Sequence, residues 1–352
     1  MKILIKNGRV WDGEQFFHAD VLTENSVIAA IAPQISEKAD SKFDAEGMTV
    51  SAGLVDCHMH FAGISSPSYA ICPEMGCLPF GVTAAADAGG TRGSSVVLDS
   101  FAVKAVVFAD SVIENDCLNE TATYRHIRML GGKCVGIKLF YDATSPKLKT
   151  IQPLRQVCAY ARKLGLKVMV HCNHSPTSML SIVETLSGGD ILSHVFHGGA
   201  NACYEDSYAA FRLARQKGVV LDAAFAGHVH TDFKVFTQAI ENGQFPDTIS
   251  TDLTKNSAYK RGGRYGLPMC MSMARTAGMD EADIFRAVTT VPANALGQDW
   301  GRLTVGAVAD IAVLRYEKEG FAFTDSDGNT FASDTGYRCK LTIADGVVVF
   351  RD

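Results

Sequence analysis

Two histidines in the stretch GLVDCHMHF, residues 53–61, are spaced so that both could bind one metal ion. The stretch begins with an apolar run, as a buried strand does, and places His58 and His60 two positions apart. Residues two apart in a β-strand point to the same side of the sheet, about 6–7 Å from each other. A metal-binding pair and two packed core histidines both fit this spacing, because motifs this short recur by chance.

Four more polar residues follow or interrupt apolar runs further along the chain: Lys138, His171, His194 and Asp252. Each has an ordinary explanation when taken alone. A buried histidine is often only hydrogen-bonded, a lysine can extend its ammonium group to solvent, and an aspartate often caps a helix or a turn. Core packing does not require all of these residues at the ends of five predicted strands, and their joint occurrence therefore indicates a functional site.

This set of residue types suits divalent metals. Neutral imidazoles bind Zn²⁺ and similar ions, and a carboxylate adds compensating charge. A tetrahedral catalytic site uses three protein ligands plus water, so the set is large enough for two metals about 3.5–4 Å apart. Lys138, with an ordinary pKa of about 10.4, would add positive charge to two dications. It therefore either lies outside the site or becomes an anionic carbamate with CO2, whose two oxygens could bridge both metals.

The centre of the chain alternates apolar runs with helical patterns, which predicts a parallel sheet. Helices are expected from Pro153 to Gly165, from Ser175-Pro176 and from Asp280. Eight strands in about 250 residues is the count of a (β/α)8 TIM barrel, whose active site lies at the carboxyl ends of its strands. A doubly wound sheet is the alternative, but no GxGxxG turn follows the first strand. The predicted strands are 54–57, 82–86, 103–108, 134–140, 167–171, 190–194, 219–222 and 248–251.

Both ends of the chain consist of short strand-like runs and turns. A hairpin-type turn at Asp345-Gly346 separates the last two runs. We therefore predict that residues 1–50 and 300–352 form one small β-sandwich domain and that residues 51–299 form the barrel.

The composition excludes several classes of partner. The net charge of −5 gives no reason to expect binding to nucleic acid or an anionic membrane. No apolar run approaches the roughly 18 residues of a membrane span, and the first residues are typical of a strand rather than a signal peptide. Ten cysteines without a CxxC pair indicate reduced thiols. We expect a cytoplasmic protein that acts on a small molecule, and association into a homo-oligomer stays open.

Taken together, these residues resemble the amidohydrolase superfamily, whose pattern is HxH on strand one, a carboxylated lysine on strand four, histidines on strands five and six, and an aspartate on strand eight. The ends also resemble it, through IKNGRV at 5–10, PANALG at 292–297 and ADIAVL at 309–314. The stretches DILSHVFHG and DTISTDLT are most similar to a branch related to dihydroorotases, which includes deacetylases.

The resemblance implies a role for each residue. His58, His60 and Asp252 would hold the more buried metal, with zinc as the expected ion, and His171 and His194 would hold the more exposed one. Carboxylated Lys138 and a hydroxide would bridge the two metals. Asp252 would take the proton of the hydroxide as it attacks a carbonyl, and then pass this proton to the leaving group.

Some positions depart from that pattern. Strand seven should end in a His-Gly-rich turn, but Phe225 stands there, with His228 and His230 displaced beyond it. His197 becomes an alternative metal ligand or substrate contact if strand six ends later than predicted. His174 is interpreted as a loop residue or a residue supporting the ligands.

The position after His60 where dihydroorotases bind a substrate carboxylate carries no arginine, which weakens that assignment. His228 and three cations after the last strand, Lys260, Arg261 and Arg264, could contact substrate, although solvated surface charge explains the cations equally well. We predict a metal-dependent hydrolase of an amide or ester of a small acylated acid, as a deacetylase is. The alternatives are an enzyme that opens cyclic amides and a non-catalytic scaffold on the same barrel.

Overall fold

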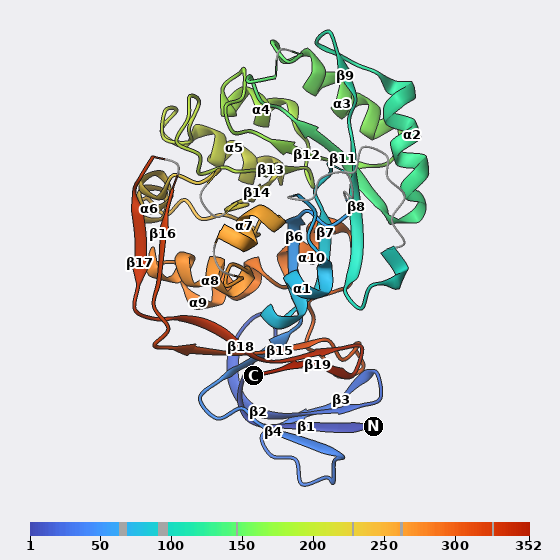
Figure 1. Ribbon diagram of the computed structural model, residues 1–352, viewed down its shortest axis with the longest axis vertical. Helices are drawn as coiled ribbons and strands as arrows, with labels where there is room; N and C mark the ends of the chain where they lie inside the picture. Colours follow the sequence, from blue (N-terminus) through green and yellow to red (C-terminus); the bar gives the residue numbers. More distant parts are fainter. Residues whose placement is uncertain (63–68, 91–97, 146, 227–228, 261–262, 326) are drawn as a thin grey trace.

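A computed structural model describes residues 1–62, 69–90, 98–145, 147–226, 229–260, 263–325 and 327–352. Its centre is a sheet in which seven strands pair in parallel in the order β14-β13-β12-β11-β8-β7-β6 (Figure 1). The seven strands agree with the first seven predicted runs to within two residues at each end. They are β6 (Leu54–Met59), β7 (Val82–Asp87), β8 (Lys104–Asp110), β11 (Cys134–Phe140), β12 (Lys167–His171), β13 (Ile191–Ser193) and β14 (Val220–Asp222).

The eighth predicted strand, 248–251, is not a strand, and this prediction was wrong. The segment makes single parallel bridges instead, from Thr248 to β14 and from Leu253 to β6. Between these bridges the backbone N–H of Ile249 donates to a carbonyl near the end of a helix, and Asp252 takes a left-handed backbone with φ +48°. No continuous ladder can form on such a backbone, but the segment still hydrogen-bonds to both edge strands of the sheet.

Helices connect most of the parallel strands and cover the sheet (Figure 1). The predicted helix after Pro153 is present, and it buries Leu154, Val157 and Ala161 on one face. The predicted helix at Asp280 is also present, and the Asp280 side chain accepts a hydrogen bond from the N–H of Ala282. The helices are α1 (Pro73–Cys77), α2 (Glu120–Leu130), α3 (Gln152–Lys163), α4 (Met179–Thr185), α5 (Ala209–Lys217), α6 (Phe233–Glu241), α7 (Lys255–Lys260), α8 (Leu267–Thr276), α9 (Glu281–Ala287) and α10 (Thr290–Leu296), with 3₁₀ turns η1 (Leu78–Phe80), η2 (Leu98–Ser100) and η3 (Gly131–Lys133).

The helix expected from Ser175-Pro176 begins later, at Met179. The Ser175 hydroxyl donates to the carbonyl of Thr177, whereas the Ser178 hydroxyl accepts from the N–H of Ser181. The residue that caps the first turn is therefore Ser178, which sets the start of α4 three residues beyond the predicted cap.

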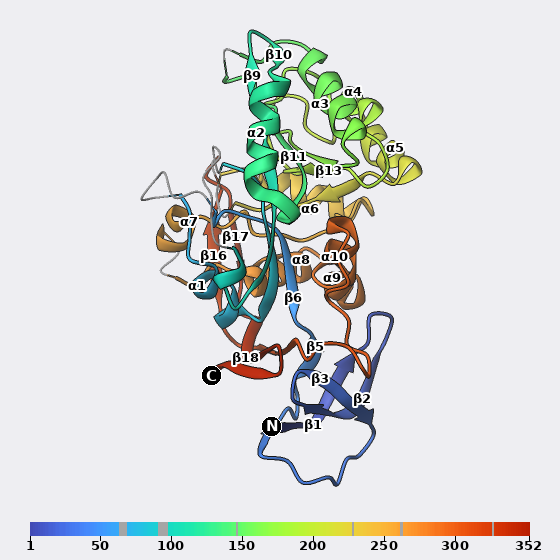
Figure 2. The same ribbon diagram turned by 90° about the vertical axis from the view of Figure 1, so that its right-hand side faces the viewer.

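The two ends of the chain pair in one mixed sheet of order β19-β18-β15-β5-β1-β2-β3, with β4 beside β1. The predicted pairing of the ends is confirmed, because β5 and β15 are antiparallel neighbours, but hydrogen bonds join all the strands in a single sheet rather than in two stacked ones. Figures 1 and 2 both place this sheet at the end of the molecule away from α3 and α4. Its strands are β1 (Lys2–Trp11), β2 (Phe16–Glu24), β3 (Val27–Ala32), β4 (Ser41–Asp44), β5 (Thr49–Ala52), β15 (Ile311–Glu317), β18 (Gly336–Ala344) and β19 (Val347–Arg351).

Two hairpins were not expected. One pairs β9 (Ile113–Glu114) with β10 (Cys117–Leu118), and the other pairs β16 (Phe321–Thr324) with β17 (Thr330–Ser333). The second hairpin runs beside α6 and α8 in Figure 1, and the ring of Phe331 contacts those of Phe233 and Phe236 in α6.

All ten cysteines are free thiols, as expected. Among the described residues, no helix combines the length and apolar character needed to cross a membrane.

Candidate metal centre

The six residues singled out by the sequence meet at the carboxyl ends of the parallel strands. All six are buried, and all six line one hollow of about 980 Å³, the strand-end hollow. They come from three strands, β6, β11 and β12, from the residue that directly follows β6, and from the turns that follow β13 and the 248–251 segment. They are His58, His60, Lys138, His171, His194 and Asp252.

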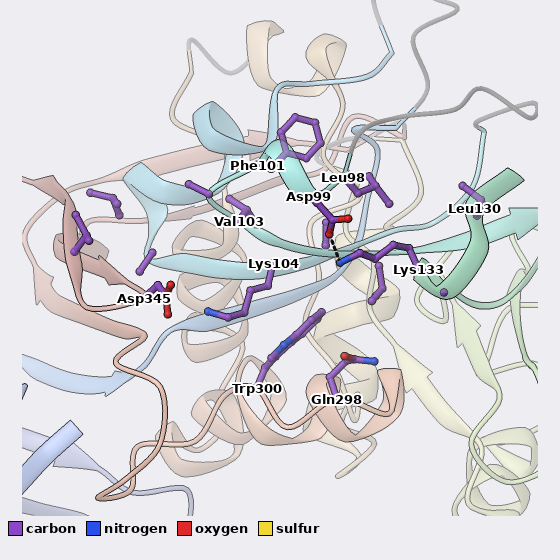
Figure 3. Close-up of a pocket in the computed structure, with 17 residues that line it drawn as sticks. Leu98, Asp99, Phe101, Val103, Lys104, Leu130, Lys133, Gln298, Trp300 and Asp345 are labelled. Carbon is purple, nitrogen blue, oxygen red and sulfur yellow. Dashed lines mark ion pairs between the residues drawn. The ribbon is translucent and has the colours of Figure 1, made fainter. Parts of the chain in front are cut away.

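A second hollow, of about 1060 Å³, opens at the opposite ends of the strands, where Lys104 begins β8 (Figure 3). Both lysines of its described lining are already paired, Lys133 with Asp99 and Lys104 with Asp310. Its described lining contains no histidine or cysteine. Because active sites of parallel α/β folds lie at the carboxyl ends of the strands, we place the chemistry in the smaller, strand-end hollow.

Asp252 is the centre of the cluster. Its Oδ1 lies 2.9 Å from Nε2 of His60 and 3.6 Å from Nε2 of His58, and its Oδ2 lies 4.0 Å from Nε2 of His194. The ligand atoms of His58, His194 and Asp252 all lie within 4.8 Å of one another. Donor atoms gathered this closely from separate elements are the arrangement that a metal ion requires.

Hydrogen bonds at Nδ1 orient three of the histidines. Nδ1 of His60 lies 2.9 Å from the Gly89 carbonyl, and Nδ1 of His194 lies 2.8 Å from the Ala224 carbonyl. Nδ1 of His58 lies 3.2 Å from Oδ2 of Asp222. An Nδ1–H that donates to such an acceptor leaves the lone pair on Nε2, which is the tautomer found in metal-binding histidines.

Two ring nitrogens of the cluster are buried without a hydrogen-bond partner among the described residues. Within the described part of the chain, Nε2 of His171 and Nε2 of His194 make no hydrogen bond. Burial and the neighbouring imidazoles hold the pKa of both residues well below the usual histidine value, so both are neutral. Burying a polar atom without a partner is costly, and a metal ion would satisfy both lone pairs. The residues present therefore fit a divalent metal.

Asp252 is ionised despite its burial. Burial alone would raise the pKa of its carboxyl group, but the adjacent imidazoles of His58 and His60 outweigh burial and lower that pKa to about 2. The carboxylate is therefore available both as a ligand and as a proton acceptor at neutral pH.

Lys138 lies inside the cluster and not outside it. Its Nζ is 3.4 Å from Nε2 of His58, and burial lowers the pKa of the ammonium group to about 8. Its side-chain stem runs against Gly89, where an added Cβ would lie 3.0 Å from Cβ and Cγ of Lys138. The glycine at this position is therefore part of the site.

His230 belongs to the cluster, although the sequence reasoning placed it beyond the site. Its Nε2 lies 3.9 Å from Oδ2 of Asp252, and its ring centroid lies 4.8 Å from that of His171 and 4.4 Å from that of His194. Left-handed backbone at Ala224 and Ala226 turns the chain back towards the strands. The available signal was the second His-x-His spacing, His228-Val229-His230, after strand seven.

The remaining predicted contacts do not join the cluster. His197 is buried outside the strand-end hollow, and neither of its ring nitrogens has a hydrogen-bond partner among the described residues. The structure thus brings His194 rather than His197 into the site. Arg264 is exposed and does not line the hollow. His228, Arg261 and the side chain of Lys260 lie outside the described residues.

Two aromatic rings flank the site. The hydroxyl of Tyr69 lies 3.2 Å from Nε2 of His60, and the ring of Phe140 stacks on that of His171 with centroids 4.1 Å apart. Both rings line the strand-end hollow and border the space that a substrate would enter.

Comparisons with known proteins agree with this geometry. The model of the amidohydrolase family matches residues 49–349. A deacetylase of Enterococcus faecalis is 28% identical, covering 98% of each chain, and one of Brucella anthropi is 27% identical over 89% of this chain and 84% of the relative. A solved dihydroorotase superposes with a TM-score of 0.87 at 23% identity, covering 100% of this chain and 98% of that one, and an adenine deaminase with 0.86 at 25%, covering 99% of each.

Proposed function

Because this chain belongs to the amidohydrolase family, we propose that it is a metal-dependent hydrolase that removes an acyl group, such as acetyl, from a small amide or ester. The observation that carries the proposal is the buried cluster around Asp252, in which Nε2 of His171 and of His194 have no protein partner. Buried polar atoms are normally hydrogen-bonded, so two unpaired imidazole nitrogens beside a buried carboxylate support a metal site.

We propose two ions, with zinc as the expected metal because the donors are mainly imidazoles. His58, His60 and Asp252 would hold one ion, and His171 and His194 the other. Lys138 would lie between them as a carbamate, formed when its neutral amine adds CO2 and loses a proton. The buried position of its Nζ beside His58 supports this role.

When bound, the metals would supply a water with its pKa lowered from about 15.7 to about 7 and would polarise the substrate carbonyl. Asp252 accepts the proton of the attacking water, since its carboxylate is ionised and central to the cluster. The same carboxyl then donates that proton to the leaving nitrogen or oxygen, so that the C–N or C–O bond breaks without expelling a strong base.

The relatives favour a deacetylase over an enzyme that opens cyclic amides. The named deacetylases align with most of their own length, whereas a dihydroorotase of Lactobacillus acidophilus aligns over 61 residues, 17% of this chain. We also propose that residues 51–299 act as a (β/α)8 barrel in which the 248–253 segment takes the place of the eighth strand. Residues 1–50 and 300–352 would form the separate small β domain.

The test is a substrate comparison on zinc-loaded protein. N-acetyl and O-acetyl derivatives of small acids are offered beside cyclic ureides, with the Asp252→Asn variant as the control for metal-dependent turnover. We expect acetate release by the wild-type protein and little by the variant. Turnover of cyclic ureides alone would overturn the deacetylase assignment, and no turnover together with less than one bound metal would favour the scaffold.

A further inference from the structure

We propose that His230 is a hydrogen-bond donor to the substrate carbonyl oxygen rather than a metal ligand, and that Asn173 holds it in this state. The inference rests on the proposed hydrolase function and assigns a role to a histidine outside the expected ligand set. It follows from the atoms that face the two nitrogens of the His230 ring.

The histidines around Asp252 divide into two kinds. His58 and His194 present Nδ1 to an oxygen, so their proton is on Nδ1 and their lone pair on Nε2. His60 presents both ring nitrogens to oxygens, Nδ1 to the Gly89 carbonyl and Nε2 to the Asp252 carboxylate. His230 instead presents Nδ1 to the side-chain nitrogen of Asn173, 2.8 Å away. An amide nitrogen only donates, so Nδ1 of His230 must accept.

The proton of His230 is therefore on Nε2, since a neutral imidazole carries a single N–H. This N–H faces the cluster, with Oδ2 of Asp252 3.9 Å away, too far for a hydrogen bond. Metal binding at Nε2 would need the lone pair that the proton occupies. His230 is therefore adjacent to the expected ligands His171 and His194, but its Nε2 has no free lone pair with which to bind the same ion.

A donor in this position suits the reaction. The ring of His230 contacts those of His171 and His194, which would hold the ion that polarises the carbonyl, and it also lines the strand-end hollow. Negative charge develops on the carbonyl oxygen as water attacks, and the fixed N–H would stabilise it there. Removal of one such donor costs about 10²- to 10³-fold in kcat.

The two residues that follow His230 are held in place by hydrogen bonds. The hydroxyl of Thr231 donates to the carbonyl of Phe225 at 3.1 Å, and the N–H of Asp232 donates to the carbonyl of Phe196 at 3.0 Å. Asn173 follows β12 directly and is buried, so it is a positioning residue that acts through His230.

The first experiment uses metal alone as its probe. The full-length wild-type, His230→Ala and His174→Ala proteins are loaded with Co²⁺, and their visible spectra and metal content are compared. His174 is the matched control, because it is exposed and outside the hollow. We expect the same spectrum and the same metal content in all three. A changed spectrum, or the loss of one equivalent of bound Co²⁺, in His230→Ala alone would show that His230 is a ligand and overturn the proposal.

The second experiment inverts the tautomer. In Asn173→Asp a carboxylate accepts from Nδ1–H and frees the Nε2 lone pair, so His230 becomes a ligand. We expect a shifted Co²⁺ spectrum and Zn²⁺ affinity raised by about 10- to 100-fold, both abolished when His230→Ala is added. An unshifted spectrum in Asn173→Asp would overturn the role of Asn173.

The third experiment measures turnover of the best acetylated substrate. In His230→Ala, kcat and kcat/KM should fall together by about 10²- to 10³-fold, because the hydrogen bond strengthens only as charge develops. If the wild-type protein turns over the substrate and His230→Ala has the same kcat, His230 is not the donor and this role is overturned. If the wild-type protein releases no acetate, the proposed function fails instead, and the spectra still decide whether His230 is a metal ligand.

Discussion

Replacing Gly89 with alanine should destabilise the metal-free protein by about 2–6 kcal/mol. Gly89 has a φ of +93°, a conformation that costs an L-residue about 1–3 kcal/mol. An added Cβ would also lie 2.8 Å from Oδ1 of Asp110 and 3.0 Å from the stem of Lys138, and crowding of this kind costs about a further 1–3 kcal/mol. Movement of residue 89 to relieve this crowding would also displace its own carbonyl, which accepts the hydrogen bond from Nδ1 of His60.

Gly278→Ala is the matched control. Gly278 has a similar φ of +103°, but an added Cβ would meet nothing within 4 Å. It should therefore carry only the backbone cost of about 1–3 kcal/mol, and the difference between the two variants isolates the crowding at the site.

The assay is urea unfolding of both metal-free variants and the wild-type protein, followed by zinc uptake of the refolded chains. Metal-free protein is needed because bound metal would add its own free energy to stability. Gly89→Ala should be the less stable variant by about 1–3 kcal/mol and should take up less zinc. Equal stability and equal zinc uptake in the two variants would refute the reasoning that Gly89 shapes the site around Lys138.

Three further predictions concern the ligands. Lys138→Ala should lose metal and activity, with partial rescue by a short-chain carboxylic acid; full activity without rescue would show that Lys138 is not a ligand. Elemental analysis should find less metal in His194→Ala than in His197→Ala, because only His194 lies in both groups of ligand atoms; equal losses would contradict this assignment. Asp252→Asn should lower kcat by about 10²- to 10⁴-fold through loss of the proton acceptor, and steady-state kinetics showing an unchanged kcat would require another base.

The parallel strands were predictable because they are buried on both faces. Such strands contain apolar runs, as β8 and β12 do, and polar residues mark their ends. The 248–251 segment is rich in β-branched residues, as strands are, but its backbone hydrogen bonds go to three different elements. No sequence pattern indicates that these hydrogen bonds are divided in this way. The start of α4 was misplaced because Ser175 and Ser178 are equally good caps in sequence.

The core of the site was predictable because His58, His60, His171 and His194 stand at or just beyond the ends of strands, where the fold determines their direction. His230 was not predictable in the same way. It reaches the cluster through two left-handed residues in a loop and a contact with Asn173, 57 residues earlier in the chain. Loop conformations of this kind depend on tertiary contacts rather than on local periodicity.

The central claim is that the cluster around Asp252 holds two divalent metals. Elemental analysis of the full-length protein, expressed with zinc supplied and purified without chelators, tests it most directly. We expect close to two equivalents of metal per chain, with metal lost on substitution of His194. Fewer than one equivalent in the wild-type protein would contradict the account.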